Sequence, residues 1–421
     1  MSDSRHLVVV GASLAGLRAV EAARADGFDG RITLIGAEPH LPYDRPPLSK
    51  AYLDELPVGQ KPESTVFRSE QMLTDDLNVE LLLGVSASGL DTAARVLSLV
   101  DGRMVDYDLL IIATGADARR LPGTDNLAGV HTLRTLDDAV AVRAALDAGA
   151  RTVIIGAGFI GSEIASGAHK RGLSPVLIEA LPTPLVRAVG EEMGAELAAL
   201  HTRNGIDLRC GVPVASIEGN GHVERVVLAD GSEIPADLVV VGAGAIPGTA
   251  WLEGSGLTVD NGVVCDKNMW TGIDGIYAAG DVARWHNAAF DRPMRLEHWT
   301  SAAEQGAIAA RNALNPSAPK SYATVPYFWS DWYDVRIQFV GSTNVDEIVV
   351  VEDLDKDGRL VALYREGDRL GGVLTVNGQT EIMKYRGQIL KRASFVDAVG
   401  FAEKRKAARS GRDRHTVATP S

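Results

Sequence analysis

The chain is poor in cysteine, has no excess of positive charge and lacks a long apolar run. Its only cysteines are Cys210 and Cys265, so a disulfide scaffold, a zinc site and dithiol redox chemistry are poorly supported. The net charge of −13 disfavours nucleic acid as a partner. Neither the start, MSDSRHLVVVG, nor any later segment has the pattern of a signal peptide or a membrane span. We therefore expect a cytoplasmic protein without a metal site or a membrane partner. Its 421 residues are too many for one core and indicate two or three domains.

One pattern occurs twice, in residues 6–38 and in residues 151–180. Each segment has a β-branched run, a glycine turn, an alanine-rich helical stretch and a second apolar run that ends near an acid, Glu38 or Glu179. In such βαβ units the turn passes close to a pyrophosphate, and the acid accepts the ribose hydroxyls. Glycines before a helix also serve tight packing alone, so one match would be weak. Two complete units predict two dinucleotide sites.

The two glycine turns differ at one position. Gly156, Gly158 and Gly161 complete the GxGxxG spacing, whereas the first unit has Gly11 and Gly16 with Ser13 in the middle. A serine Cβ holds the backbone farther from the phosphates, or the hydroxyl donates a hydrogen bond to them. Both interpretations of Ser13 stay open on the sequence.

Three later segments also predict strands that end in turns. DLLIIATGAD ends at Thr114 and Gly115, DLVVVGAGA ends at Gly242, and GIYAAGDVA delivers Gly280 and Asp281. Ligands of doubly wound sheets bind at such strand ends, so we expect Asp281 to bond a ribitol or ribose hydroxyl. The alternative is that Asp281 caps the next helix.

The segment LPYDRPPLSK, residues 41–50, is stiff because each proline fixes its φ angle and biases the preceding residue toward extended conformations. It is either a rigid surface connector or a wall that holds Arg45 and Lys50 against a bound anion or redox cofactor.

Six motifs give the chain a family resemblance. GASLAG, PYDRPPLSK, ATGAD, GAGFIGSEIA, YAAGDVA and EHWTSAAEQG occur in this order between about His6 and about Phe401. In these motifs the chain resembles the NADH-dependent ferredoxin reductases of oxygenase systems, the family of putidaredoxin reductase and the biphenyl-type dioxygenase ferredoxin reductases. The resemblance implies an α/β, glutathione-reductase-like fold with two Rossmann-type domains and a C-terminal α/β domain. The expected parts are an FAD-binding domain (1–117 and 247–320), an NAD-binding domain (118–246) and a C-terminal domain (321–405). The remaining residues, 406–421, are a basic tail that departs from the family pattern, and their composition predicts disorder.

The resemblance also implies roles for single residues. Lys50 lies near the flavin N5, with Glu163 as its partner, although the helix dipole alone would favour a carboxylate at Glu163. A helix starting near Thr300 points its N-terminus at the flavin, with Trp299 beside the ring and Glu297 near the nicotinamide. Arg134 pairs with an FAD phosphate or forms a surface ion pair.

The full set assigned to cofactor binding is Gly11, Ser13, Ala15, Gly16, Glu38, Arg45, Lys50, Val85, Ala113, Thr114, Gly115, Arg134, Gly156, Gly158, Phe159, Ile160, Gly161, Glu163, Glu179, Arg187, Gly242, Gly280, Asp281, Glu297 and Trp299. Lys50 and Glu163 are the residues assigned to the catalytic centre.

The activity implied is hydride transfer from NADH to FAD, followed by single-electron transfer to a small, acidic iron–sulfur ferredoxin that feeds a cytochrome P450 or a Rieske oxygenase. Dithiol reductases carry their redox cysteines where this chain has prolines and Lys50. Alternatives are a reductase or oxidase with another acceptor, such as rubredoxin or oxygen, and a flavoprotein whose redox state controls partner binding. Trp332, in WSDWYD, departs from the glutamine common in the family, and Trp329, Trp332 and Tyr333 are either core or partner-facing residues.

Overall fold

The computed structural model describes residues 4–57, 59–124 and 126–416. The chain forms two compact units. Unit 1 comprises Met1–Gly123, His131–Ala144 and Val241–Thr324, and unit 2 comprises Thr124–Val130, Ala145–Val240 and Val325–Ser421. Most of helix α2 (Leu136–Asp147) therefore belongs to unit 1, although the sequence places it in the NAD-binding domain. The C-terminal segment shares unit 2 with residues 145–240.

Unit 1 is built on a five-stranded parallel sheet. Its strands, in spatial order, are β19 (Ile276–Ala278), β7 (Leu109–Ile112), β1 (His6–Val10), β2 (Arg31–Gly36) and β3 (Val79–Leu83). Because the strands are parallel, the turns after β1, β7 and β19 meet at one edge of the sheet. The sequence predicts ligand-binding turns at these three strand ends.

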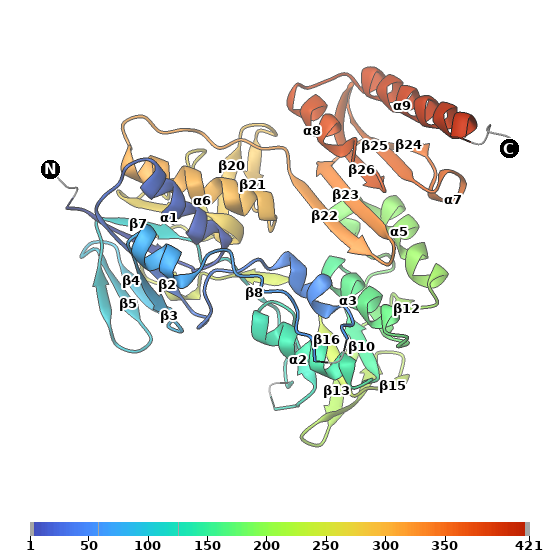
Figure 1. Cartoon of the computed structure of the whole chain (residues 1–421), viewed down its shortest axis with the longest axis horizontal. Coiled ribbons are helices and arrows are strands. Elements are labelled where there is room, and N and C mark those ends of the chain that lie inside the picture. Colours follow the sequence, from blue (N-terminus) through green and yellow to red (C-terminus); the bar gives the residue numbers. More distant parts are fainter. Residues whose placement is uncertain (1–3, 58, 125, 417–421) are drawn as a thin grey trace. The chain divides into compact units, whose positions relative to one another are not determined.

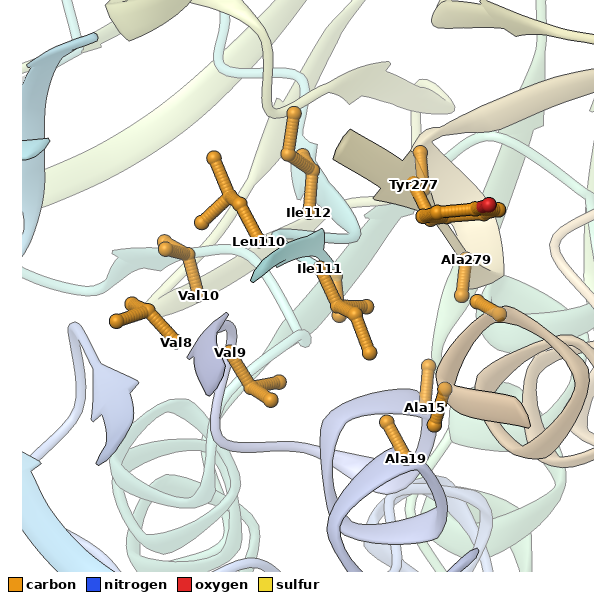
Figure 2. Packing of buried hydrophobic residues seen from close by; sticks show 14 of the residues in the cluster. Val8, Val9, Val10, Ala15, Ala19, Leu110, Ile111, Ile112, Tyr277 and Ala279 are labelled. Atoms are coloured by element: carbon orange, nitrogen blue, oxygen red, sulfur yellow. The ribbon is translucent and has the colours of Figure 1, made fainter. Parts of the chain in front are cut away.

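The core of unit 1 lies between this sheet and two helices, α1 (Leu14–Ala25) and α6 (Trp299–Leu314), which lie side by side (Figure 1). Val9 and Ile111 point toward Ala15 and Ala19 of α1 (Figure 2). Small residues allow the close helix pairing: a Cβ on Gly306 of α6 would lie 2.1 Å from the carbonyl oxygen of Ala15.

Smaller sheets complete unit 1. They are β4 (Ala87–Asp91), β5 (Val96–Leu99) and β6 (Met104–Asp106); β18 (Val263–Cys265), β20 (Ala283–Asn287) and β21 (Arg292–Met294); and the pair β8 (Ala116–Ala118) and β17 (Ala245–Pro247).

Unit 2 contains a second five-stranded sheet with the order β12 (Asp207–Cys210), β11 (Val176–Glu179), β10 (Thr152–Ile155), β16 (Leu238–Val241) and β9 (Val130–His131). β10, β11 and β12 are parallel. Helix α3 (Phe159–Lys170) follows β10, and α4 (Val186–Val189) and α5 (Glu191–Arg203) follow β11. A three-stranded antiparallel sheet consists of β13 (Val214–Gly219), β14 (Val223–Leu228) and β15 (Glu233–Pro235).

The C-terminal part of unit 2 is an antiparallel sheet with three helices. Its strands, in spatial order, are β22 (Tyr327–Trp332), β23 (Val335–Gly341), β26 (Arg369–Val376), β25 (Leu360–Glu366) and β24 (Glu347–Glu352). A short helix, α7 (Leu354–Asp357), follows β24, α8 (Ile382–Leu390) packs against β23 and β26, and α9 (Phe395–Thr416) packs against β24, β25 and β26 (Figure 1).

The basic tail differs from the disorder that its composition predicts. Residues 406–416 continue α9, while 417–421 lie outside the described residues. Arg405 and Arg409 form ion pairs with the buried Glu381, and Arg409 also pairs with the buried Glu352. Arg405 directly precedes the tail and Arg409 lies within it, and composition alone does not reveal their pairing with these carboxylates.

Candidate cofactor-binding sites

The first glycine turn has the tight geometry of a dinucleotide-binding turn. Gly11 has a φ of +123°, and a Cβ there would lie 2.0 Å from the carbonyl oxygen of Ala113. A Cβ on Gly16 would lie 2.0 Å from the carbonyl oxygen of Gly11. These two glycines are required by the approach of β1, α1 and β7, which also brings Ala113, Thr114 and Gly115 to the same edge.

The PYDRPPLSK segment folds over this turn through Arg45. The guanidinium donates to Glu38 at 2.6 Å, to the Ser13 Oγ at 3.3 Å and to the carbonyl oxygen of Arg134 at 2.5 Å. The Tyr43 hydroxyl donates to the other oxygen of Glu38 at 2.6 Å, and burial raises the pKa of Tyr43, so the donor keeps its proton. Arg45 thus has a defined place beside the turn, which favours the wall over the surface connector.

Ser13 makes a contact that the sequence analysis did not anticipate, and its two interpretations toward a phosphate stay predictions. It is the N-cap residue of α1, yet its side chain makes no capping bond; instead its Oγ accepts from Arg45. The serine therefore helps to orient a cation at the turn, and no sequence pattern pairs residues 13 and 45.

Arg134 and Asp281 meet at the same edge of the sheet. They form an ion pair at 2.9 Å with side chains 28% and 14% exposed. Burial lowers the pKa of Arg134, but the Asp281 carboxylate opposes this and the net shift is upward. A Cβ on Gly115 would lie 3.4 Å from this guanidinium, and the Gly280 N–H donates to Gln305 at 2.8 Å. The structure brings these predicted residues together; their contacts with FAD remain predictions.

Asp44 is a site residue that the sequence reasoning missed. It accepts a hydrogen bond from the Trp299 indole N–H at 2.8 Å. Burial raises the pKa of Asp44, while the Trp299 bond and the charges of Lys50 and Arg18 oppose the rise. Asp44 therefore fixes the ring of Trp299, and its place in PYDRPP was the available signal.

The other predicted residues of unit 1 have simpler surroundings. The Lys50 Nζ donates to the carbonyl oxygen of Pro46 at 3.4 Å. Glu297 pairs with Arg295 at 2.8 Å, and the buried Val85 follows β3, where its N–H donates to Gly36. Gly242 directly follows β16.

The second glycine turn has an open face at which a pyrophosphate has room to approach the protein backbone. A Cβ on Gly161 would lie 2.0 Å from the carbonyl oxygen of Gly156, but a Cβ on Gly158 would meet no atom within 4 Å. The next residues diverge: Phe159 packs on Phe328 with ring centroids 4.6 Å apart, while Ile160 is 43% exposed.

Glu179 points back at this second turn. One carboxylate oxygen accepts from the Ala157 N–H at 3.1 Å and the other from the Leu181 N–H at 3.0 Å. The acid is therefore fixed beside the turn, as a ribose-binding residue requires. Arg187 lies on α4, eight residues further along the chain.

Glu163 is buried on α3 and contacts the C-terminal sheet. The Ser330 hydroxyl donates to Glu163, and the Trp332 indole N–H donates to the Ser330 Oγ at 2.8 Å. Trp332 and Tyr333 are buried and so belong to the core, while Trp329 is half-buried and its role stays open. Lys50 and Glu163 belong to different units, so their pairing stays a prediction.

Both cysteine thiols have raised pKa values, which disfavours the reactive thiolate. Burial raises the pKa of Cys265 to about 12, and burial together with the Glu179 charge raises that of Cys210. Within the described ranges, no three His, Cys, Asp or Glu side chains are grouped so as to hold a metal ion, and no helix has the length and apolarity to cross a membrane.

Two glycine turns, each with its acid and each following a strand of a parallel array, define a protein of the two-dinucleotide oxidoreductase class. The chain belongs to the pyridine nucleotide-disulphide oxidoreductase family, whose profile matches residues 5–306, and residues 327–410 match the reductase C-terminal family. The glutathione-reductase-like fold, the enzyme class and the use of FAD and NAD(H) are thereby confirmed.

Individual relatives agree with the resemblance drawn from the motifs. The chain is 37% identical to rhodocoxin reductase of Rhodococcus erythropolis, over 90% of this chain and 88% of the relative. It is 36% identical to putidaredoxin reductase of Pseudomonas putida, over 90% of each chain. The solved covalent complex of putidaredoxin reductase with putidaredoxin superposes with a TM-score of 0.87 at 34% identity, covering 93% of this chain and 94% of that one.

Proposed function

We propose that this protein takes hydride from NADH onto FAD and passes single electrons to a small, acidic iron–sulfur ferredoxin. That ferredoxin would serve a cytochrome P450 or a Rieske oxygenase, and we place the reaction in the cytoplasm. The observation that carries the proposal is the amino-acid sequence of residues 41–50. Prolines and Lys50 stand where a dithiol would have to be, and the two thiols of the chain are elsewhere, with raised pKa values. Relatives named as reductases of rhodocoxin and putidaredoxin support the choice of acceptor.

The residues of unit 1 fit FAD as a ligand. FAD, when bound, supplies the conversion between a two-electron hydride donor and a one-electron acceptor. Arg45, held by Glu38 and Ser13, would bind a phosphate. Asp281 would accept a hydrogen bond that a hydroxyl of the sugar chain donates. Asp44 would keep the Trp299 ring in one orientation beside the flavin.

Lys50 and Glu163 would act at the hydride-transfer position. A fixed ammonium group stabilises negative charge that develops on the reduced ring, because a preorganised cation needs no reorganisation during the reaction. Glu163, the fifth residue of α3, would orient Lys50 and the nicotinamide.

Lys50→Met tests the proposal. Anaerobic stopped-flow mixing with NADH should show flavin reduction slowed at least about tenfold, which corresponds to about 1.4 kcal/mol of lost transition-state stabilisation. FAD content should not change, and the exposed Lys61→Met serves as the matched control. Equal reduction rates in both variants would refute the role of Lys50.

A further inference from the structure

A chain of hydrogen bonds approaches Glu163 from the C-terminal sheet. Ser330, on β22, is fully buried and its hydroxyl donates to the Oε1 of Glu163 on α3. The indole N–H of Trp332, two residues along the same strand, donates to the Ser330 Oγ at 2.8 Å. All three residues belong to unit 2.

The chemistry of these groups fixes the direction of both hydrogen bonds, from Trp332 to Ser330 and from Ser330 to Glu163. An indole N–H only donates, an ionised carboxylate only accepts, and a serine hydroxyl has a single proton. Because Trp332 occupies an acceptor position of the Ser330 oxygen, the hydroxyl proton is left for Glu163. Aligned donors of this kind reinforce each other in a dry interior.

The far end of the chain is held rigidly. Trp332 is fully buried and stacks on His201 with ring centroids 4.9 Å apart. The His201 ring bonds the Tyr333 hydroxyl at 2.6 Å and the Ser162 Oγ at 3.0 Å. Burial lowers the pKa of His201 to about 4, so at neutral pH the ring against which Trp332 stacks carries no charge.

We propose that Ser330 is a positioning residue for hydride transfer. Its hydroxyl, whose proton is directed toward Glu163 by the hydrogen bond from Trp332, holds the Glu163 carboxylate in one orientation. The inference rests on the proposed role of Glu163. Without the Ser330 hydroxyl, the carboxylate loses a buried donor and can turn away from the position at which it orients Lys50 and the nicotinamide. Trp332 thereby gains a function in the position where the family commonly has glutamine.

The test is a double-mutant cycle between Ser330→Ala and Glu163→Gln, with hydride transfer measured by anaerobic stopped flow over a range of NADH concentrations. Ser330→Ala should lower the limiting rate about tenfold and leave the apparent Kd for NADH within about twofold, since it affects orientation rather than binding. In the Glu163→Gln background the same substitution should change the limiting rate less than about twofold. Trp332→Phe keeps a buried ring but removes the N–H, and it should also lower the limiting rate, as Ser330→Ala does.

Ser166→Ala is the matched structural control. The Ser166 Oγ accepts from the Tyr333 backbone N–H at 2.6 Å. The variant therefore also loses a buried hydrogen bond between α3 and the end of β22, but it leaves the bond to Glu163 intact. It should lower the melting temperature but not the limiting rate.

Three results would overturn the inference. They are a rate for Ser330→Ala equal to that of Ser166→Ala, an equal loss in the wild-type and Glu163→Gln backgrounds, and an unchanged rate for Trp332→Phe. If Glu163→Gln itself transfers hydride at the wild-type rate, the proposed role of Glu163 fails first and the inference fails with it. A slow Glu163→Gln with a fast Ser330→Ala refutes the inference alone.

Discussion

Replacement of Glu179 by glutamine should weaken the preference of this protein for NADH over NADPH. Glu179 lies at the end of β11 and each of its oxygens accepts one backbone N–H, from Ala157 or Leu181. The carboxylate therefore has free lone pairs for the ribose hydroxyls of NADH but cannot swing away from a 2′-phosphate without breaking these bonds.

The magnitude follows from the two ways of accommodating NADPH. Like charges about 4 Å apart at an effective dielectric of about 20 repel by up to about 4 kcal/mol, and the phosphate carries more than one charge. Turning Glu179 away instead costs two hydrogen bonds to a charged acceptor, at about 1.5 to 3 kcal/mol each. Screening and pairing of the phosphate with Arg187 reduce the repulsion, but about 2.8 kcal/mol still gives a hundredfold preference for NADH.

The assay is the ratio of kcat/KM for NADH to that for NADPH, with ferricyanide as acceptor. Glutamine has one acceptor oxygen and disturbs the turn for both nucleotides, but the ratio cancels damage that they share. Glu179→Gln should lower the ratio at least about tenfold, whereas Glu191→Gln, at an exposed acid of α5, should not change it. A wild-type ratio near one, or a ratio insensitive to Glu179→Gln, would show that Glu179 does not face the ribose.

Two predictions concern stability. Because burial lowers the pKa of His201 to about 4 from 6.5, the folded protein keeps this ring neutral while the unfolded chain protonates it below 6.5. The free energy of unfolding should therefore be undiminished by this group above pH 6.5 and fall by on the order of 3 kcal/mol as the pH drops to about 4; urea titrations should show a shallower fall in His201→Gln. Among the described residues, replacing Arg405 and Arg409 together by methionine leaves the buried Glu352 and Glu381 paired only with Arg359, and it should destabilise unit 2 by about 3 to 5 kcal/mol in the same assay. A loss below about 1 kcal/mol would mean that these two arginines do not stabilise the fold.

Local patterns were sufficient to predict the two βαβ units. Hydrophobic runs, glycine turns and closing acids are all contained within about thirty residues, so β1, α1, β2, β10, α3 and β11 follow from the sequence. The helix expected near Thr300 begins at Trp299. The antiparallel C-terminal sheet was also predictable, because its strands are aromatic or β-branched runs separated by turns.

Contacts between distant segments were not predictable. Ser330 donates to Glu163 across 167 positions, and Trp299 donates to Asp44 across 255. Neither residue pair shares a periodicity or a motif, so only the folded chain brings them together. The tail is a further example. Its basic composition predicts disorder, and its ion pairs with buried carboxylates from distant segments are visible only in the folded chain.

The most direct test of the central claim is anaerobic stopped flow in two stages. One equivalent of NADH should first bleach the flavin, and mixing with an acidic iron–sulfur ferredoxin should then restore it. Because a hydride carries two electrons and the acceptor takes one, two ferredoxin molecules should be reduced for each NADH consumed. Rapid bleaching followed by reoxidation no faster with ferredoxin than with buffer, or faster with oxygen or rubredoxin, would contradict the account.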